Sequence, residues 1–400
     1  MAGAGGRAAA WQRRRFGAYE LLAPLATGGT AEIFLARHSG HGGVDRLLVV
    51  KQLLPEIADD PEFKRMFLDE ARLGGKLTHP NVVYTYELGE ADGRAFIALE
   101  YLDGLTVGQL AIRSRARLPG GLPAELCAGI MRDALMGLHH AHEAKLSDGR
   151  PLLIVHRDVS PQNLIVTYAG EVKVVDLGIA HAAVREARTR TGLVKGKFAY
   201  MSPEQCKGLP VDRRTDVFAA GVVLHELLTG ARLFKRKSTY ETYQAILGGE
   251  VPPPSRSNPA VDAELDRIVL TALALEPASR WPTAAAFAGA LEAWLARRGF
   301  GATAPRMAAF YQANFGPEHE EHRRRIGALL AGKNVPAPQQ SWEDDEGPSV
   351  GRRVADPDAK TVVGAEPAGG RRRGSLKPAL VAVAIILTAV VAAILVSLAR

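Results

Sequence analysis

Residues 156–163, HRDVSPQN, are the stretch from which the fold and the chemistry of this chain can be predicted. Asp158 places a carboxylate five residues before the carboxamide of Asn163, and a second acid, Asp176, follows the next apolar run. Carboxylate and amide oxygens are the ligands that Mg²⁺ prefers in proteins. Each acid, taken singly, is also a common turn residue. Together they predict a phosphoryl-transfer loop in which Asn163 and Asp176 hold metal and Asp158 orients a hydroxyl nucleophile.

A glycine-containing turn, LATGGTAEIF (25–34), joins two predicted strands upstream of this loop. Gly28 and Gly29 have no side chain, so their backbone N–H groups can approach a phosphate closely. The positions that would complete a G-x-G-x-x-G pattern are Ala26 and Ala31. The turn alone is therefore also typical of an ordinary hairpin.

Lys51 ends the apolar run LLVVK, where a lysine is costly to bury unless it is paired. Glu70, in the charged helical stretch that follows, is a candidate partner. Such a pair would hold the Lys51 ammonium against the phosphates of a nucleotide. A solvent-exposed lysine at the end of a strand is the alternative.

Sequence periodicity divides the folded part of the chain into two lobes. Residues 16–102 contain short β-like runs with one charged helical stretch, and residues 103–295 are mainly helical in pattern. Brief strands are also expected around the opening motif, at residues 152–158, 163–168 and 171–178. We therefore expect an α+β fold with a β-rich N-lobe, a helical C-lobe and the chemistry-bearing loops between them.

Composition restricts the class of protein. The chain has 400 residues, of which 47% are hydrophobic and 23% are charged, as in globular proteins. Its two cysteines, Cys127 and Cys206, have no metal-ligand spacing and exclude a disulfide framework or a zinc site. The net charge of +7 is concentrated in arginine clusters, which suit an anionic surface or form solvated faces. Residues 1–15 are predicted to be a disordered basic N-terminus, and residues 296–334 a helical extension.

The last part of the sequence predicts a membrane anchor. Residues 335–378 are rich in proline, glycine and charge and are expected to be a disordered juxtamembrane linker. Residues 379–399, ALVAVAIILTAVVAAILVSLA, carry no charge and as a helix would span about 30 Å, the thickness of a bilayer core. Arg371–Arg373 and Lys377 precede this run, so the positive-inside rule places the folded part on the cytoplasmic face of the inner membrane.

From residue 16 to residue 295 the chain resembles the bacterial Hanks-type (eukaryotic-like) Ser/Thr protein kinases. The motifs LATGGTAEIF, VVK, DEA, HRDVSPQN, DLG, MSPE, DVFAAG and EPASRWPT occur in the order typical of that family. The resemblance implies a bilobal kinase fold that binds ATP between the N-lobe and the C-lobe. It also implies Mg²⁺, or Mn²⁺ in its place, and transfer of the γ-phosphate to Ser or Thr of protein substrates.

The resemblance assigns a role to each matching position. Lys51 corresponds to the lysine that grips the phosphates, Glu70 to its ion-pair partner, and Asp158 to the catalytic aspartate, while Asn163 and Asp176 correspond to the metal ligands. Leu99 is at the gatekeeper position. The implied ATP-binding residues are Leu25, Gly28, Gly29, Ile33, Val49, Lys51, Leu99, Glu100, Leu102 and Ile165. The implied structural residues are Asp216 and the buried ion pair of Glu204 and Arg280.

The residue before the catalytic aspartate implies regulation by phosphorylation. Arg157 is typical of kinases in which a phosphate on the activation segment supplies a counter-charge for this arginine. The segment offers Thr189 and Thr191 as acceptors. We therefore expect autophosphorylation at one or both threonines.

Two positions depart from the family pattern, and we interpret them as one exchange. Ser160 stands where the family usually has a lysine, two residues after Asp158, and Lys197 stands where it usually has a threonine. Lys197 would then supply the cation near the γ-phosphate, and Ser160 the hydrogen bond that steadies Asp158. The alternative is that Lys197 is a solvated loop residue and the enzyme is crippled.

Three functions remain to be compared. The first is an active membrane-tethered kinase, the second a pseudokinase scaffold at the membrane, and the third a nucleic-acid binder. The complete set of phosphate- and metal-site residues favours the first, and anionic lipid explains the arginine clusters better than nucleic acid does. Thr361, in DAKTVVGAEP, is a candidate ligand for a phosphothreonine-reading domain. The substrates, the activating signal and any dimerisation cannot be predicted from this sequence.

Overall fold

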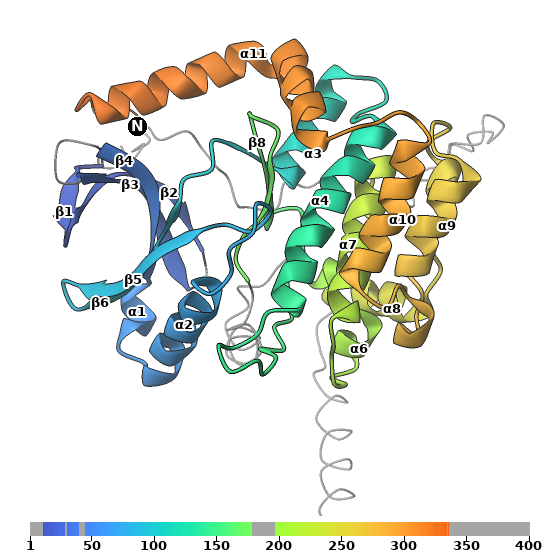
Figure 1. Cartoon of the computed structure of the whole chain (residues 1–400), viewed down its shortest axis with the longest axis horizontal. Coiled ribbons are helices and arrows are strands. Elements are labelled where there is room, and N and C mark those ends of the chain that lie inside the picture. Colours follow the sequence, from blue (N-terminus) through green and yellow to red (C-terminus); the bar gives the residue numbers. More distant parts are fainter. Residues whose placement is uncertain (1–10, 29, 40–44, 178–196, 334, 336–400) are drawn as a thin grey trace, which may run out of the picture. The chain divides into compact units, whose positions relative to one another are not determined.

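The computed structural model describes residues 11–28, 30–39, 45–177, 197–333 and 335, with Lys197 described only in its backbone. These residues form the two predicted lobes, a β-rich N-lobe and a helical C-lobe (Figure 1). Within these ranges no helix is long and apolar enough to cross a membrane. The predicted span at 379–399, Thr361 and the activation-segment threonines lie outside the described residues.

The N-lobe is built on a six-stranded antiparallel sheet in the order β1-β2-β3-β4-β6-β5. Its strands are β1 (Arg14–Phe16), β2 (Tyr19–Thr27), β3 (Ala31–Ser39), β4 (Asp45–Leu53), β5 (Thr85–Ala91) and β6 (Arg94–Glu100). Two helices, α1 (Pro55–Ala58) and α2 (Pro61–Gly74), connect β4 to β5. Helix α2 begins after Asp60, whose carboxylate accepts hydrogen bonds from the backbone N–H groups of Glu62 and Phe63.

The alternation of side chains along β4 separates the N-lobe core from the candidate site. Leu48 and Val50 are buried in an aromatic cluster that includes Phe34 and Phe96. Because successive side chains of a strand point to opposite faces, the intervening residues face the other way. Val49 and Lys51 therefore lie on the opposite face of the sheet, which borders the pocket of the candidate site.

The prediction of a disordered N-terminus is wrong for residues 11–15, because this segment packs onto the sheet. The ring of Trp11 stacks on Phe34 with centroids 5.2 Å apart, and the guanidinium of Arg14 lies 5.5 Å from the Trp11 ring centroid. Strand β1 pairs with β2 through a tight turn at Gly17, whose φ of +56° favours glycine. The basic charge of this segment concealed the apolar and cation–π contacts that order it.

The C-lobe consists mainly of helices packed around α7. The helices are α3 (Val107–Arg117), α4 (Ala124–His142), α6 (Pro203–Cys206), α7 (Arg214–Thr229), α8 (Thr239–Gly248), α9 (Ala263–Ala272) and α10 (Ala284–Ala296). Short 3-10 turns are η1 (Lys197–Tyr200), η2 (Pro254–Arg256) and η3 (Pro277–Ser279). A three-stranded sheet of β7 (Gly104–Thr106), β8 (Leu164–Thr167) and β9 (Val172–Val174) faces the N-lobe side. Helix α7 is buried over nearly its whole length, which explains its weak amphipathic pattern.

The strand predicted at residues 152–158 is wrong, since this segment has no regular secondary structure. Leu153 and Arg157 have φ values of +51° and +64°, which no strand accommodates. The backbone N–H groups of His156 and Arg157 donate to the carboxylate of Asp216 at 2.8 Å each instead of to a neighbouring strand. The apolar run therefore resembled a strand in sequence, although its following backbone N–H groups are bonded by a side chain and not by a neighbouring strand.

Helix α11 (Thr303–Leu330) occupies most of the segment for which a helical extension was predicted. The helix is kinked at Phe315, whose φ of −136° is not helical, just before Pro317. Arg117 caps the kink, because its guanidinium donates to the carbonyl of Asn314 at 3.1 Å and lies 4.5 Å from the Phe315 ring centroid. In Figure 1 the helix passes from the helical lobe to the strands of the N-lobe.

A buried ion pair ties the segment after η1 to the loop between α9 and α10. The guanidinium of Arg280 donates to both carboxylate oxygens of Glu204, at 2.7 and 2.8 Å. Both side chains are nearly inaccessible to solvent. Burial alone would raise the pKa of Glu204, but the hydrogen bonds from Arg280 hold it below its ordinary value.

We expect Glu204→Gln to lower the free energy of unfolding by about 3–5 kcal/mol at pH 7, because it leaves the Arg280 charge buried and unpaired. The carboxylate has a lower pKa in the folded than in the unfolded chain, so its stabilisation is present at neutral pH and lost as the pH falls through the folded pKa. Urea unfolding should therefore show a difference from the parent that shrinks on acidification. Glu264→Gln, which breaks an exposed pair with Arg297, is the control and should cost less than about 1 kcal/mol.

Candidate active site

The loop that carries Asp158 is anchored from beneath by Asp216 at the start of α7. Besides the two backbone N–H groups of the loop, the Asp216 carboxylate contacts Nε2 of His142 on α4 at 2.7 Å. Burial would raise the pKa of this carboxyl, but the hydrogen bond and charge of His142 lower it. Asp216 is therefore an ionised anchor that joins α4, α7 and the loop.

Asp158 and Asn163 lie together, as their spacing predicted. The Nδ2 group of Asn163 donates to the backbone oxygen of Asp158 at 2.7 Å and to its carboxylate Oδ2 at 3.0 Å. The carboxamide closes the loop and fixes the orientation of the carboxylate. Because its nitrogen faces Asp158, the oxygen of the Asn163 carboxamide is turned away from it.

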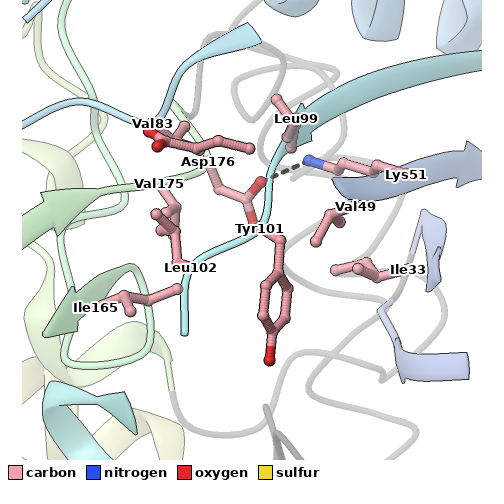
Figure 2. A pocket seen from close by; sticks show the side chains of 11 residues that line it. Ile33, Val49, Lys51, Val83, Leu99, Tyr101, Leu102, Ile165, Val175 and Asp176 are labelled. Carbon is pink, nitrogen blue, oxygen red and sulfur yellow. Dashed lines mark hydrogen bonds and ion pairs between the residues drawn. The ribbon is translucent and has the colours of Figure 1, made fainter. Parts of the chain in front are cut away.

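Lys51 joins the two lobes through its ammonium group. Its Nζ lies 3.1 Å from Oε1 of Glu70 on α2. It also lies 2.7 Å from Oδ1 of Asp176, which follows β9 (Figure 2). Burial alone would lower the pKa of Lys51, but the two carboxylates raise it above its ordinary value, so the ammonium stays charged. Asp176 has a φ of +53°, a strained conformation of the kind that is common at functional sites.

An apolar pocket that is partly open to solvent lies beside Lys51, and small-molecule sites are typically concave and lined mainly by apolar side chains. Figure 2 shows Ile33 and Val49 of the N-lobe on one side and Ile165 and Val175 on the other. Seven of its lining residues were predicted to bind ATP: Ile33, Val49, Lys51, Leu99, Glu100, Leu102 and Ile165. The remaining lining residues are Val83, Tyr101, Val175 and the predicted metal ligand Asp176.

Two predicted ATP-binding positions do not line this pocket. Leu25 is buried against helix α11. The N–H of Gly28 donates to the carbonyl of Ala31 at 2.8 Å, and a Cβ at this glycine would lie at an ordinary 3.5 Å from the same oxygen. Gly29 lies outside the described residues. The described protein atoms therefore do not themselves require a glycine at position 28, and its role toward phosphate stays a prediction.

Val83, Tyr101 and Val175 were missed by the sequence analysis. Val175 immediately precedes Asp176 in an apolar run, and Tyr101 lies between Glu100 and Leu102, which were predicted to bind ATP, so their positions along the chain could have indicated them. Val83 could not be found in this way. It reaches the pocket because its N–H donates to the carbonyl of Val174 at 2.9 Å, a contact between distant segments.

The donors around the pocket fit a nucleotide with Mg²⁺. A carboxylate from Asp176 and a carboxamide oxygen from Asn163 are the hard ligands that this ion takes alongside phosphate oxygens. Within the described ranges no cluster of three or more His, Cys, Asp or Glu residues forms a metal site of the protein alone. Mg²⁺ is commonly bound by one or two carboxylates together with substrate phosphates, so Asn163 and Asp176 would hold it jointly with a nucleotide.

The remaining predicted residues are only partly described. The Ser160 hydroxyl is buried and makes no hydrogen bond, to Asp158 or to any other group, within the described part of the chain. Lys197 begins η1, but its side chain lies outside the description, as do Thr189 and Thr191. Because the Lys197 side chain is not described, the structure does not test the exchange of roles between Ser160 and Lys197, which stays a hypothesis.

Comparison with known proteins now assigns this arrangement to a family. The model of the protein kinase domain matches residues 19–289, which include both lobes and every side chain of the pocket. The chain belongs to the protein kinase family. The kinase is similar to the crystal structure of the PknI kinase domain of Mycobacterium tuberculosis, with a TM-score of 0.52 and 28% identity over 73% of this chain and 99% of that one.

Curated relatives of the kinase are named with different specificities. "Tyrosine-protein kinase MasK" of Myxococcus xanthus is 48% identical over 78% of this chain and 48% of its own length. "Serine/threonine-protein kinase PrkC" of Bacillus subtilis is 35% identical over 68% of this chain and 40% of its own length. "Serine/threonine-protein kinase PknB" of Mycobacterium leprae is 37% identical over 67% and 41%. The kinase thus spans about half or less of the length of these relatives.

Proposed function

We propose that this kinase transfers the γ-phosphate of ATP to serine or threonine of protein substrates and to its own activation segment. The observation that carries the proposal is the Lys51 ammonium held between Glu70 and Asp176 at the rim of an apolar pocket. A pure scaffold has no need for a buried cation flanked by two carboxylates. The relatives named PrkC and PknB support serine/threonine specificity.

The geometry gives each group a task in phosphoryl transfer. Asp158, oriented by Asn163, would accept a hydrogen bond from the substrate hydroxyl and direct it toward the phosphate. Lys51 would position the phosphates, and its pairing with Glu70 keeps its ammonium at the pocket. Mg²⁺ held by Asn163 and Asp176 would neutralise charge on the phosphates.

The acceptor residue has a second candidate. The relative of higher identity, MasK, is named a tyrosine kinase, whereas those at 35–37% identity are named serine/threonine kinases. Tyrosine as the acceptor is therefore the alternative specificity of this site. Identification of the phosphorylated amino acid decides between them.

We expect the kinase, as the chain of residues 1–400, to incorporate label from γ-labelled ATP with Mg²⁺. The rate of incorporation should be at least about 100-fold lower for the Asp158→Asn protein. Acid hydrolysis of the product should yield phosphoserine and phosphothreonine, and peptide mapping should find phosphate on Thr189 or Thr191. Phosphotyrosine alone would assign the alternative specificity. Binding of ATP without any transfer would identify a pseudokinase scaffold.

Arg157 supports the autophosphorylation part of this proposal. Its backbone is held by Asp216, yet its guanidinium forms no ion pair with any carboxylate in the part of the chain that the structure describes. A phosphate on the activation segment would supply the missing counter-charge. If mapping finds neither Thr189 nor Thr191 modified, this role is excluded.

The exchange of Ser160 and Lys197 remains part of the proposal. Ser160 is a buried residue of the catalytic loop whose hydroxyl makes no hydrogen bond within the described residues, so a change in the loop could bring it to Asp158. Lys197 starts the 3-10 turn at the end of the same segment that carries Thr189 and Thr191. A cation from that segment would replace the lysine missing from the loop.

We expect Ser160→Lys and Lys197→Thr each to lower the rate by about 100-fold or more, since each leaves the site without a correctly placed group. The double variant should recover most of the activity, because it restores the arrangement usual in the family. The measurement is kcat/KM for a protein substrate. Full activity in Lys197→Ala would contradict the exchange.

Tethering to a membrane is proposed from residues 379–399 alone, which are uncharged over a length that spans a bilayer. We expect the full-length kinase to sediment with bacterial membranes and to be released by detergent but not by salt. Ile386→Asp combined with Val391→Asp should shift it to the supernatant, because each central charge costs about 2.5–3.5 kcal/mol. A parent chain found in the supernatant would exclude the tether.

A further inference from the structure

Helix α11 lies outside the matched family range, and its two halves pack against different lobes. Met307, Tyr311 and Phe315 are fully or almost fully buried in the C-lobe core. After the kink, Leu329 is 1% exposed in a cluster with Leu22 and other residues of the N-lobe strands. One helix therefore connects the two lobes independently of the hinge, which is the segment 101–103 between β6 and β7 (Figure 1).

The middle of the second half of α11 contacts the hinge through His322. Its Nε2 lies 2.7 Å from the hydroxyl of Tyr101 and 2.9 Å from Oδ1 of Asp103. The imidazole and the Tyr101 hydroxyl form a hydrogen bond. Asp103 lies within ion-pair distance of the same nitrogen but is not aligned for a hydrogen bond.

His319, one turn earlier, completes the contact. Its ring stacks on Tyr168 with centroids 4.0 Å apart, and its Nε2 lies 3.6 Å from Oδ2 of Asp103. The backbone oxygen of Asp103 accepts the N–H of Tyr168 at 2.8 Å. Burial would raise the pKa of Asp103, but His322 and His319 lower it, which agrees with an ionised carboxylate between two imidazoles.

This contact borders the nucleotide pocket. Tyr101 lines the pocket, and in Figure 2 its ring extends from the pocket with the hydroxyl at the far end. Ile33, Val49 and Tyr101 also pack against the buried apolar cluster that contains Leu329 of α11, as does Ile326 of the same helix. The residues that would enclose an adenine are thus supported from behind by the helix.

We propose that His322 is a positioning residue for nucleotide binding, which holds Tyr101 and Asp103 so that the hinge wall of the pocket is formed before ATP arrives. The inference rests on the proposed function, since it assumes that the pocket takes ATP. A preformed wall lowers the entropy that binding must remove. A hinge released from α11 has to be ordered by the nucleotide itself, at the expense of affinity.

The test compares full-length His322→Leu with His322→Gln and with Arg324→Ala, which alters an exposed side chain on the same helix. Calorimetry of Mg²⁺-ATP binding should show a Kd about two- to tenfold higher for the leucine variant, the range set by one lost hydrogen bond. The glutamine variant, which retains a donor, should stay within about twofold of the parent, as should Arg324→Ala. In kinetics, KM for ATP should rise with little change in kcat, and amide exchange at residues 101–103 should quicken.

Tyr101→Phe serves as a second variant if His322→Leu does not fold, because it removes the hydroxyl and keeps the ring in the pocket wall. It should raise Kd in the same direction. A Kd unchanged or lowered in both variants would overturn the positioning role while leaving the proposed function intact. A parent protein that binds no ATP would overturn the proposed function, and this inference with it.

Discussion

The buried carboxylate of Asp216 is the contact on which the arrangement of the site depends. It sits at the start of α7, which is enclosed by the other helices of the C-lobe, and it accepts the backbone N–H groups of His156 and Arg157. These two bonds replace the strand that the apolar residues before them would otherwise form. They accompany the left-handed conformation of Arg157, after which the side chains of Asp158 and Asn163 contact each other. A carboxylate deep in the helical lobe thus orients the loop at its surface.

The N-lobe contributes the opposite half of the site through a different constraint, the two-residue period of β4. This period directs Val50 into the aromatic core and Val49 and Lys51 toward the pocket. Lys51 then meets Glu70 from α2 and Asp176 from the C-lobe, so a single ammonium on β4 contacts carboxylates from two other segments. Burial makes this cation expensive unless both carboxylates remain in place, which couples the position of α2 to the position of the C-lobe loop.

The features that were predictable from the sequence are those encoded by local period or by short spacing. The strands around Lys51, the pairing of Lys51 with Glu70, and the closeness of Asp158 to Asn163 are of this kind. The conformation of segment 152–158 was not predictable, because the backbone N–H groups of His156 and Arg157 donate to a carboxylate about 60 residues away. Residues 11–15 are ordered because Trp11 stacks on Phe34. Leu25 is buried in a cluster with Leu329 of α11, about 300 residues away. No local pattern contains contacts of that range.

The position of Leu329 also has a consequence for the order in which the protein is made. The cluster of Leu22, Ala23, Leu25 and Leu35 emerges from the ribosome first, but the residue that covers it follows about 300 positions later. Until α11 is synthesised, these strands expose an apolar face, and the hinge lacks its contact with His322. Because contacts of such separation form late, the N-lobe is the first lobe to be translated and the last to be completed. Nascent chains that stop near residue 295 would contain every motif of the family and still present an unfinished lobe to chaperones.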